Sequence, residues 1–214
     1  MKIMDKAIAA SGISAADKNK ARMLKLSALY RMNGKEEECV KASEDLIAQP
    51  DATKPQKYSA YFLGGIRAGQ KDPAKFLEYM KKACENAENK DAVQASAVYL
   101  IIAYIRNRQT DKARALAEQY RMQAKQTKDI NFECRIHYVS VSAYPASERQ
   151  TYLEKAIASD DTLECRYGQL LARTLLNEHY SRQPDKAKAL CERVLKAKQV
   201  YLPDFRKKLA ALSK

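Results

Sequence analysis

The sequence predicts an all-α fold built from a repeated pair of antiparallel helices. Three observations predict it: a composition poor in helix breakers, a helical apolar stripe that recurs at a nearly constant interval, and a second helical segment before each stripe. Gly and Pro together account for 12 of the 214 residues, against roughly 12% of an average protein. Residues that favour helices, such as Ala, Leu and Lys, are abundant instead.

Five segments carry apolar or small residues with the spacing i, i+4, i+7 and i+8, although the third lacks its last member and the fourth begins with an arginine. This is the pattern of a helix with one buried face. The first residues of successive segments are separated by 37, 37, 36 and 38 residues. Five evenly spaced stripes indicate a repeated unit. The stripes begin at Cys39, Phe76, Ala113, Arg149 and Ala187.

A second helix precedes each stripe, so each unit is predicted to be a helix pair. Pro73, Pro145 and Pro184 mark the starts of stripe helices, because proline is tolerated in the first turn. Short connections within a unit favour antiparallel neighbours. Polar loops are expected between units, at 48–55, 86–91, 126–131 and 158–163. The preceding helices are expected at 21–32, 58–69, 94–107, 133–144 and 166–180.

The chain is predicted to form a single helical repeat domain over residues 1–214. Pro203 begins a short amphipathic segment, 203–213, that we expect to cap the stack at its C-terminal end. Residues 1–16 are expected to cover the other end. The repeats are expected at about 17–50, 55–88, 92–126, 130–159 and 163–199.

The units resemble the tetratricopeptide repeat, which pairs two antiparallel helices in about 34 residues. The first unit carries the family pattern as Leu26, Ser27, Tyr30, Gly34 and Cys39. The interval here is nearer 37, and Arg149 stands where the family has a small residue, so the chain resembles a divergent member. The resemblance implies a right-handed α-α superhelix of about five helix pairs with terminal capping helices.

The resemblance also implies a non-enzymatic adaptor or scaffold that binds a peptide or helix of a partner protein. Stacked helix pairs expose a long concave surface, which suits such a ligand. An alternative for the apolar members of this face is packing between neighbouring units. The residues expected to bind the partner are Arg31, Tyr58, Tyr61, Ile102, Arg106, Asn131, Tyr138, Leu176, His179 and Tyr180.

The formal net charge is +13, which leaves a second class of function open. Basic residues gather at 106–114 and 196–208, and such clusters attract phosphates or acidic surfaces. The alternative function is therefore binding of nucleic acid or of an acidic surface, including an acidic protein partner. Self-association of the scaffold is a third interpretation.

No catalytic residue, cofactor or metal site is predicted. The chain has two histidines and lacks the common nucleophile, zinc-protease, phosphate-loop and dinucleotide motifs. Cys134, His137, Cys165 and His179 can be drawn as four zinc ligands, but their spacing matches no zinc finger. The five cysteines, without close pairs, are expected to be free and mostly buried thiols.

A cytoplasmic location is expected from the N-terminal residues. Asp5 and Lys6 interrupt what would be the apolar part of a secretory signal. A secreted or periplasmic mature form whose signal has been removed remains the alternative. No apolar run reaches the 18 residues of a membrane-spanning helix, so no span is expected.

Overall fold

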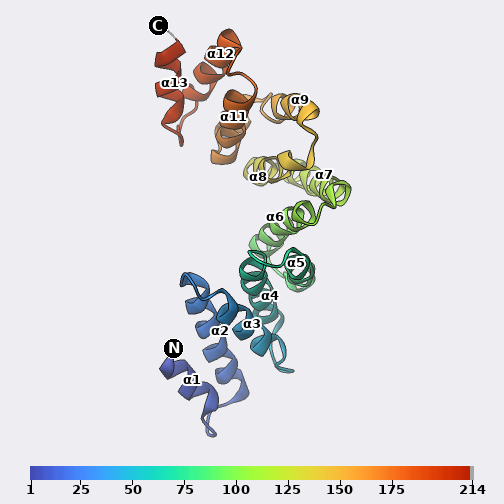
Figure 1. The fold of residues 1–214 in the computed structure, drawn as a ribbon, viewed down its shortest axis with the longest axis vertical. Coiled ribbons are helices and arrows are strands. Elements are labelled where there is room, and N and C mark those ends of the chain that lie inside the picture. The colour runs from blue at the N-terminus through green and yellow to red at the C-terminus, as the bar shows by residue number, and fades with distance from the viewer. Residues whose placement is uncertain (213–214) are drawn as a thin grey trace. The chain divides into compact units, whose positions relative to one another are not determined.

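The computed structural model of the chain describes residues 1–212 (Figure 1). Helices account for 77% of the residues, and residues 1–212 contain no strand, which confirms the all-α class. The helices are α1 (Lys2–Ala9), α2 (Ala15–Arg31), α3 (Glu36–Ile47), α4 (Lys54–Ala68), α5 (Pro73–Asn86), α6 (Lys90–Arg106), α7 (Thr110–Gln126), α8 (Ile130–Ser140), η1 (Val141–Ala143), α9 (Ala146–Ala156), α10 (Asp160–Leu163), α11 (Arg166–Glu178), α12 (Pro184–Leu195) and α13 (Asp204–Leu212).

The predicted helices are present, and most loops fall where the sequence places them. Pro73 and Pro184 occupy the first turns of α5 and α12, whereas Pro145 lies one residue before α9. The polar segment 158–163 was expected to be a loop, and this was wrong in part because it contains α10. The side chain of Ser159 accepts a hydrogen bond from the backbone N–H of Asp161, which supports that single helical turn.

The chain divides into two compact units, Met1–Gln109 and Thr110–Lys214. The boundary falls between α6 and α7, which is inside the third predicted helix pair. Within the first unit, α3 packs against α4, α4 against α5, and α5 against α6. Within the second unit, α7 packs against α8, α8 against α11, and α12 against α13.

Two adjacent glycines let α4 pack closely against both of its neighbours. A Cβ atom on Gly64 would lie 2.2 Å from Ser43 Oγ on α3, and one on Gly65 would lie 2.5 Å from Met80 Cε on α5. Glycine weakens a helix by roughly 1 kcal/mol relative to alanine. Close packing on both sides accounts for its presence here.

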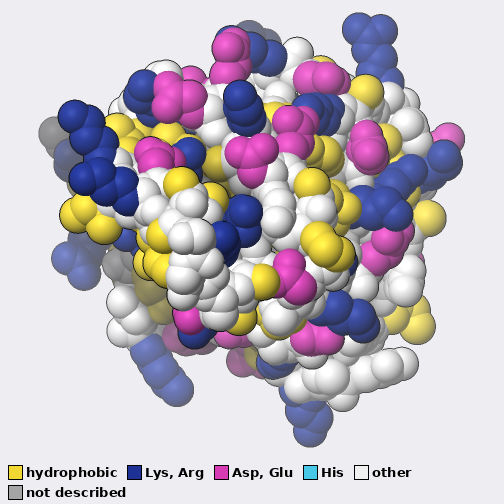
Figure 2. Space-filling view, turned by 90° about the horizontal axis from the view of Figure 1, so that it is seen from below, with side chains coloured by type: hydrophobic (Ala, Val, Ile, Leu, Met, Phe, Trp, Pro, Cys, Tyr) yellow, Lys and Arg dark blue, Asp and Glu magenta, His cyan; other side chains and the backbone are white. Residues whose placement is uncertain are grey.

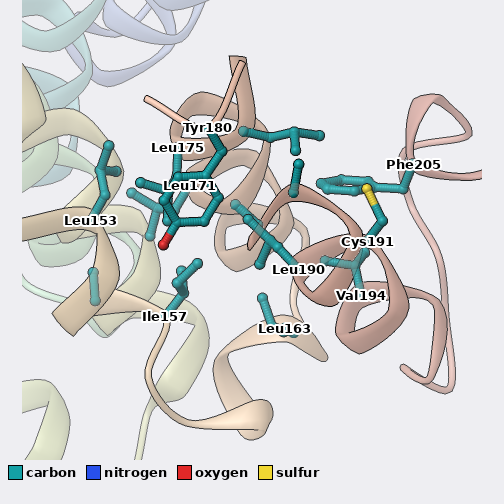
Figure 3. Close-up of a cluster of buried hydrophobic side chains, with 14 residues drawn as sticks. Leu153, Ile157, Leu163, Leu171, Leu175, Tyr180, Leu190, Cys191, Val194 and Phe205 are labelled. Atoms are coloured by element: carbon teal, nitrogen blue, oxygen red, sulfur yellow. The ribbon is translucent and has the colours of Figure 1, made fainter. Parts of the chain in front are cut away.

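Each unit has a hydrophobic core between its helices. In the first unit Leu26, Leu29, Cys39 and Leu46 are almost completely buried between α2 and α3. In the second unit the core gathers side chains from α9, α10, α11, α12 and α13, including Leu171, Leu190 and Phe205 (Figure 3). Phe205 anchors α13, the helix predicted as a cap; residue 213 of that prediction lies outside the described residues.

All five cysteines are free thiols, as the sequence predicted. Cys39, Cys134, Cys165 and Cys191 are buried, and Cys84 is partly buried. Within residues 1–212 we find no helix of the length and apolar character needed to cross a membrane.

Candidate partner-binding site

Three of the predicted partner-binding residues lie on α2 and α4 in the first unit. Arg31 is exposed at the end of α2, and Tyr58 and Tyr61 are half-buried on α4. The ring of Tyr58 stacks on Phe62 with centroids 5.5 Å apart, and Tyr61 meets Tyr79 edge to face at 5.6 Å. The two tyrosines therefore join a packed aromatic group and keep only part of their surface for a ligand.

Ile102 and Arg106 lie one turn apart on α6 of the same unit. Ile102 is half-buried. The Arg106 guanidinium donates a hydrogen bond of 3.1 Å to the carbonyl oxygen of Gly69 and lies 5.3 Å from the ring centroid of Phe76. The positive charge of Arg106 therefore stabilises the C-terminal end of α4, where the last helix carbonyls lack hydrogen-bond partners within the helix.

One other arginine of the basic segments, Arg114, makes the same kind of contact. Arg114 Nε donates to the carbonyl oxygen of Ala143 at 2.8 Å, and its guanidinium lies 5.1 Å from the Tyr144 ring centroid. On the face drawn in Figure 2, Lys and Arg side chains alternate with Asp and Glu side chains. Part of the positive charge near residues 106–114 is thus used within the fold.

The predicted residues Asn131 and Tyr138 lie on α8 in the second unit, and both are exposed. The Tyr138 ring contacts Tyr167 on α11, with centroids 5.8 Å apart. His179 is half-buried just after α11. These three side chains retain surface that a partner can reach.

Leu176 and Tyr180, also predicted to bind a partner, are buried in the core of the second unit. The Tyr180 hydroxyl donates a hydrogen bond of 2.9 Å to Glu154, and its ring lies among Leu175 and Ile157 in Figure 3. Burial raises the pKa of Tyr180 to about 12. Tyr180 therefore packs the core. Leu176 is also buried, but one side of its side chain lines a cleft at the surface.

That side of Leu176 lies at the floor of a cleft between α11 and α13. The cleft has a volume of about 350 Å³, and its apolar lining consists of the buried Leu176 and Phe205 and the exposed Ala211. Its rim carries Arg173, Asn177, Asp204, Lys207 and Lys208. Arg173 forms an ion pair of 3.4 Å with Asp204, and neither Lys207 nor Lys208 has an ion pair within residues 1–212.

The cleft between α3, α4 and α5 has a different charge balance. Its volume is about 370 Å³, and its cations are matched by carboxylates. Lys71 pairs with Glu37 at 2.9 Å, and Lys75 pairs with Glu44 at 2.6 Å. In the α11–α13 cleft, by contrast, Lys207 and Lys208 have no carboxylate partner within residues 1–212.

A third cleft, of about 480 Å³ between α7 and α10, borders a buried polar group. His137 Nδ1 lies 2.8 Å from the Tyr152 hydroxyl, which lies 2.9 Å from Ser140 Oγ. Burial, together with the nearby charges of Arg121 and Lys125, lowers the pKa of His137 to about 3. Ser140 is fully buried and donates to the helix backbone, so this group packs the helices and offers no accessible nucleophile.

No group of three or more potential metal ligands occurs within the described part of the chain. Of the four residues that can be drawn as zinc ligands, the structure brings Cys134 and Cys165 together and binds His137 to Tyr152. The chain matches no family model, no curated protein and no solved structure among those compared with it.

Sequence reasoning missed most of the α11–α13 cleft. It placed Leu176 at a binding surface and Lys207 and Lys208 in a basic segment, but did not bring them together. The signal available was the amphipathic pattern of 203–213, which indicated that one face of this segment is buried. Which helix it packs beside is decided by the core contact of Phe205.

Proposed function

We propose that the protein is a non-enzymatic interaction module whose second unit binds an acidic segment of a partner protein in the α11–α13 cleft. The observation that carries the proposal is a basic rim around an apolar floor. Three cations and one carboxylate border the cleft, and that carboxylate, Asp204, is already paired with Arg173. A surface of this charge favours acidic ligands and disfavours basic ones.

The shape of the cleft favours a short amphipathic helix as the bound segment. Two neighbouring helices form a groove into which a third helix places its apolar face. An apolar side chain of the partner is expected to reach Leu176 and Ala211, while its acidic side chains meet Lys207 and Lys208. The charged contacts set specificity and association rate, and the apolar contact supplies the desolvated anchor.

Hydrogen bonds within each unit support a tetratricopeptide-like repeat. Arg67 on α4 donates to the carbonyl oxygen of Tyr30 at the end of α2, and the two residues are 37 apart. In the second unit Arg193 and Ile157 make the same link over 36 residues. Because each link spans one repeat, these bonds support the repeated helix pair. The proposal also includes about five such pairs in a right-handed superhelix, which the resemblance to the tetratricopeptide repeat implies.

The experiment measures binding of two fluorescent probe peptides by anisotropy. One peptide is an amphipathic helix with Leu on one face and Glu on the other, and the second carries Lys in place of Glu. We expect the acidic peptide to bind more tightly. Reversing both rim charges, with Lys207→Glu and Lys208→Glu, is expected to weaken its binding by about tenfold or more, which corresponds to about 1.4 kcal/mol.

The matched control reverses two exposed lysines outside the cleft, with Lys196→Glu and Lys198→Glu. It changes the net charge equally, so it is expected to leave most of the affinity intact. Equal losses in both double variants would contradict a site in this cleft. A duplex oligonucleotide that binds more tightly than the acidic peptide, with affinity falling steeply as salt rises, would favour the nucleic-acid alternative.

A further inference from the structure

Two cysteines, one on α8 and one at the residue before α11, converge on one backbone oxygen in the second unit. Cys134 Sγ on α8 lies 3.8 Å from the carbonyl oxygen of Thr162, and Cys165 Sγ, just before α11, lies 3.3 Å from the same atom. The two thiols are close enough for each to shift the pKa of the other. They are 31 residues apart in the sequence, so this contact is tertiary.

The two thiols have different surroundings. The backbone N–H of Gly168 donates to Cys165 Sγ at 3.3 Å, in the first turn of the 13-residue helix α11. A hydrogen bond from Cys134 and the amides of this turn lower the pKa of Cys165 to about 7. The same hydrogen bond, together with burial, raises the pKa of Cys134. Cys165 is therefore the more acidic thiol of the pair, and Cys134 keeps its proton.

Gly168 is required for this arrangement. A Cβ atom at this position would lie 1.6 Å from the carbonyl oxygen of Thr162. The close approach of Thr162 to the start of α11 holds the carbonyl oxygen between the two sulfurs. The short helix α10 and the turn after it thus position both cysteines.

We propose that Cys134 and Cys165 are a redox-responsive modification site that forms a reversible disulfide by exchange with a low-molecular-weight disulfide. The geometry that carries the proposal is the meeting of two thiols at one carbonyl oxygen and the helix amide that donates to one of them.

The exchange has two steps. The Cys165 thiolate attacks one sulfur of the small disulfide, whose S–S bond breaks and releases one thiolate, which takes up a proton. Cys134 then loses its proton and attacks Cys165 Sγ, which releases the second small thiol. Two protein thiols are oxidised, and one small disulfide is reduced to two thiols.

The other three cysteines lack this arrangement, and burial raises the pKa of Cys84, which is only partly buried. Cys39 is fully buried, and burial raises its pKa to about 11. Cys191 is also fully buried, in the core beside Phe205, and burial raises its pKa (Figure 3). A thiol that keeps its proton is a poor nucleophile, so neither is expected to react while the protein is folded.

The experiment incubates the folded 214-residue chain with oxidised glutathione at several ratios to reduced glutathione. The remaining thiols are then blocked by alkylation under denaturing conditions, and the tryptic peptides are identified by mass spectrometry. We expect one disulfide, linking the peptides that contain Cys134 and Cys165, and recovery of both thiols on reduction. The alkylated chain then carries three labels in place of five.

Two variants separate the chemistry from folding. Cys134→Ser is expected to stop the exchange at the first step, so that one glutathione stays attached to Cys165. Cys39→Ser, a control at another buried cysteine, is expected to leave the Cys134–Cys165 disulfide unchanged. The proposal would be overturned if Cys134 and Cys165 were both alkylated at every ratio, or if the glutathione adduct of Cys134→Ser formed at another cysteine.

Discussion

Arg193 on α12 donates a hydrogen bond of 2.9 Å to the carbonyl oxygen of Ile157, the residue that follows α9. Arg106 on α6 makes the equivalent bond of 3.1 Å to Gly69, which follows α4. The partners are separated by 36 and 37 residues. These separations match the distance along the sequence between successive apolar stripes. In both cases an arginine binds the C-terminal end of a helix one repeat earlier.

Arg193→Ala is expected to lower the free energy of unfolding by about 1–2 kcal/mol, because hydrogen bonds from a charged group to two helix-end carbonyls are lost. The second of these bonds runs to Ala158 at 3.1 Å. Urea unfolding followed by circular dichroism measures the change. Arg182→Ala, at an exposed position outside any helix, removes the same charge and is the control. Equal effects of the two substitutions would contradict a specific role for the helix-end contact.

Gly64→Ala is expected to destabilise the protein by about 1–3 kcal/mol, because the added methyl group must displace Ser43 and overpacking costs this much. Gly12→Ala is the matched control, since a Cβ atom at Gly12 has no atom within 4 Å. Thermal unfolding of the two variants makes the comparison. An unchanged melting temperature for Gly64→Ala would show that α4 does not pack against α3 as described.

The buried His137 predicts how stability depends on pH. Its pKa is about 3 in the folded protein, against an ordinary value of 6.5, because burial disfavours the charged ring. The unfolded chain therefore takes up the proton first, and stability present above pH 6.5 is lost as the pH falls towards 3. The loss approaches about 1.4 kcal/mol per pH unit.

Urea unfolding between pH 6.5 and 5 tests this dependence, because most carboxyl groups remain ionised in that window. His137→Gln is expected to flatten the curve, because it removes the group that titrates between the two pKa values. A wild-type free energy of unfolding that stays constant over the same window would show that His137 is not buried in its neutral form.

Leu176 and Tyr138 are expected to differ in how much their side chains contribute to the free energy of unfolding. Leu176→Ala is expected to cost about 2–4 kcal/mol of stability, because its side chain is 3% exposed and truncation leaves a cavity. Tyr138→Ala is expected to cost less than about 1 kcal/mol, because Tyr138 is 37% exposed. Chemical denaturation measures both values. The reverse order would place Tyr138 in the core and Leu176 on the surface.

The helices were predictable because their signal is local. Apolar residues at helical spacing and the prolines at 73 and 184 placed the helices correctly. The short helix α10 was missed, because a single capped turn has no apolar periodicity to reveal it. The convergence of Cys134 and Cys165 was missed for another reason: it depends on how α8 packs against α11.

The distribution of charged residues along the sequence predicted the surface less well than the apolar spacing predicted the helices. The excess at 106–114 indicated a basic surface, yet Arg106 and Arg114 bind backbone carbonyls and aromatic rings. Counting charges does not reveal which of them are used within the fold. In the α11–α13 cleft, by contrast, Lys207 and Lys208 remain at the rim beside Leu176.

Hydrogen–deuterium exchange with and without the acidic amphipathic peptide tests the proposed site most directly. Peptide binding in the α11–α13 cleft is expected to slow exchange in α11 and α13 and to leave exchange in α2 and α3 unchanged. Lys207→Glu with Lys208→Glu is expected to abolish this protection. Protection confined to helices of the first unit, or none at a peptide concentration that saturates anisotropy, would contradict binding in the α11–α13 cleft.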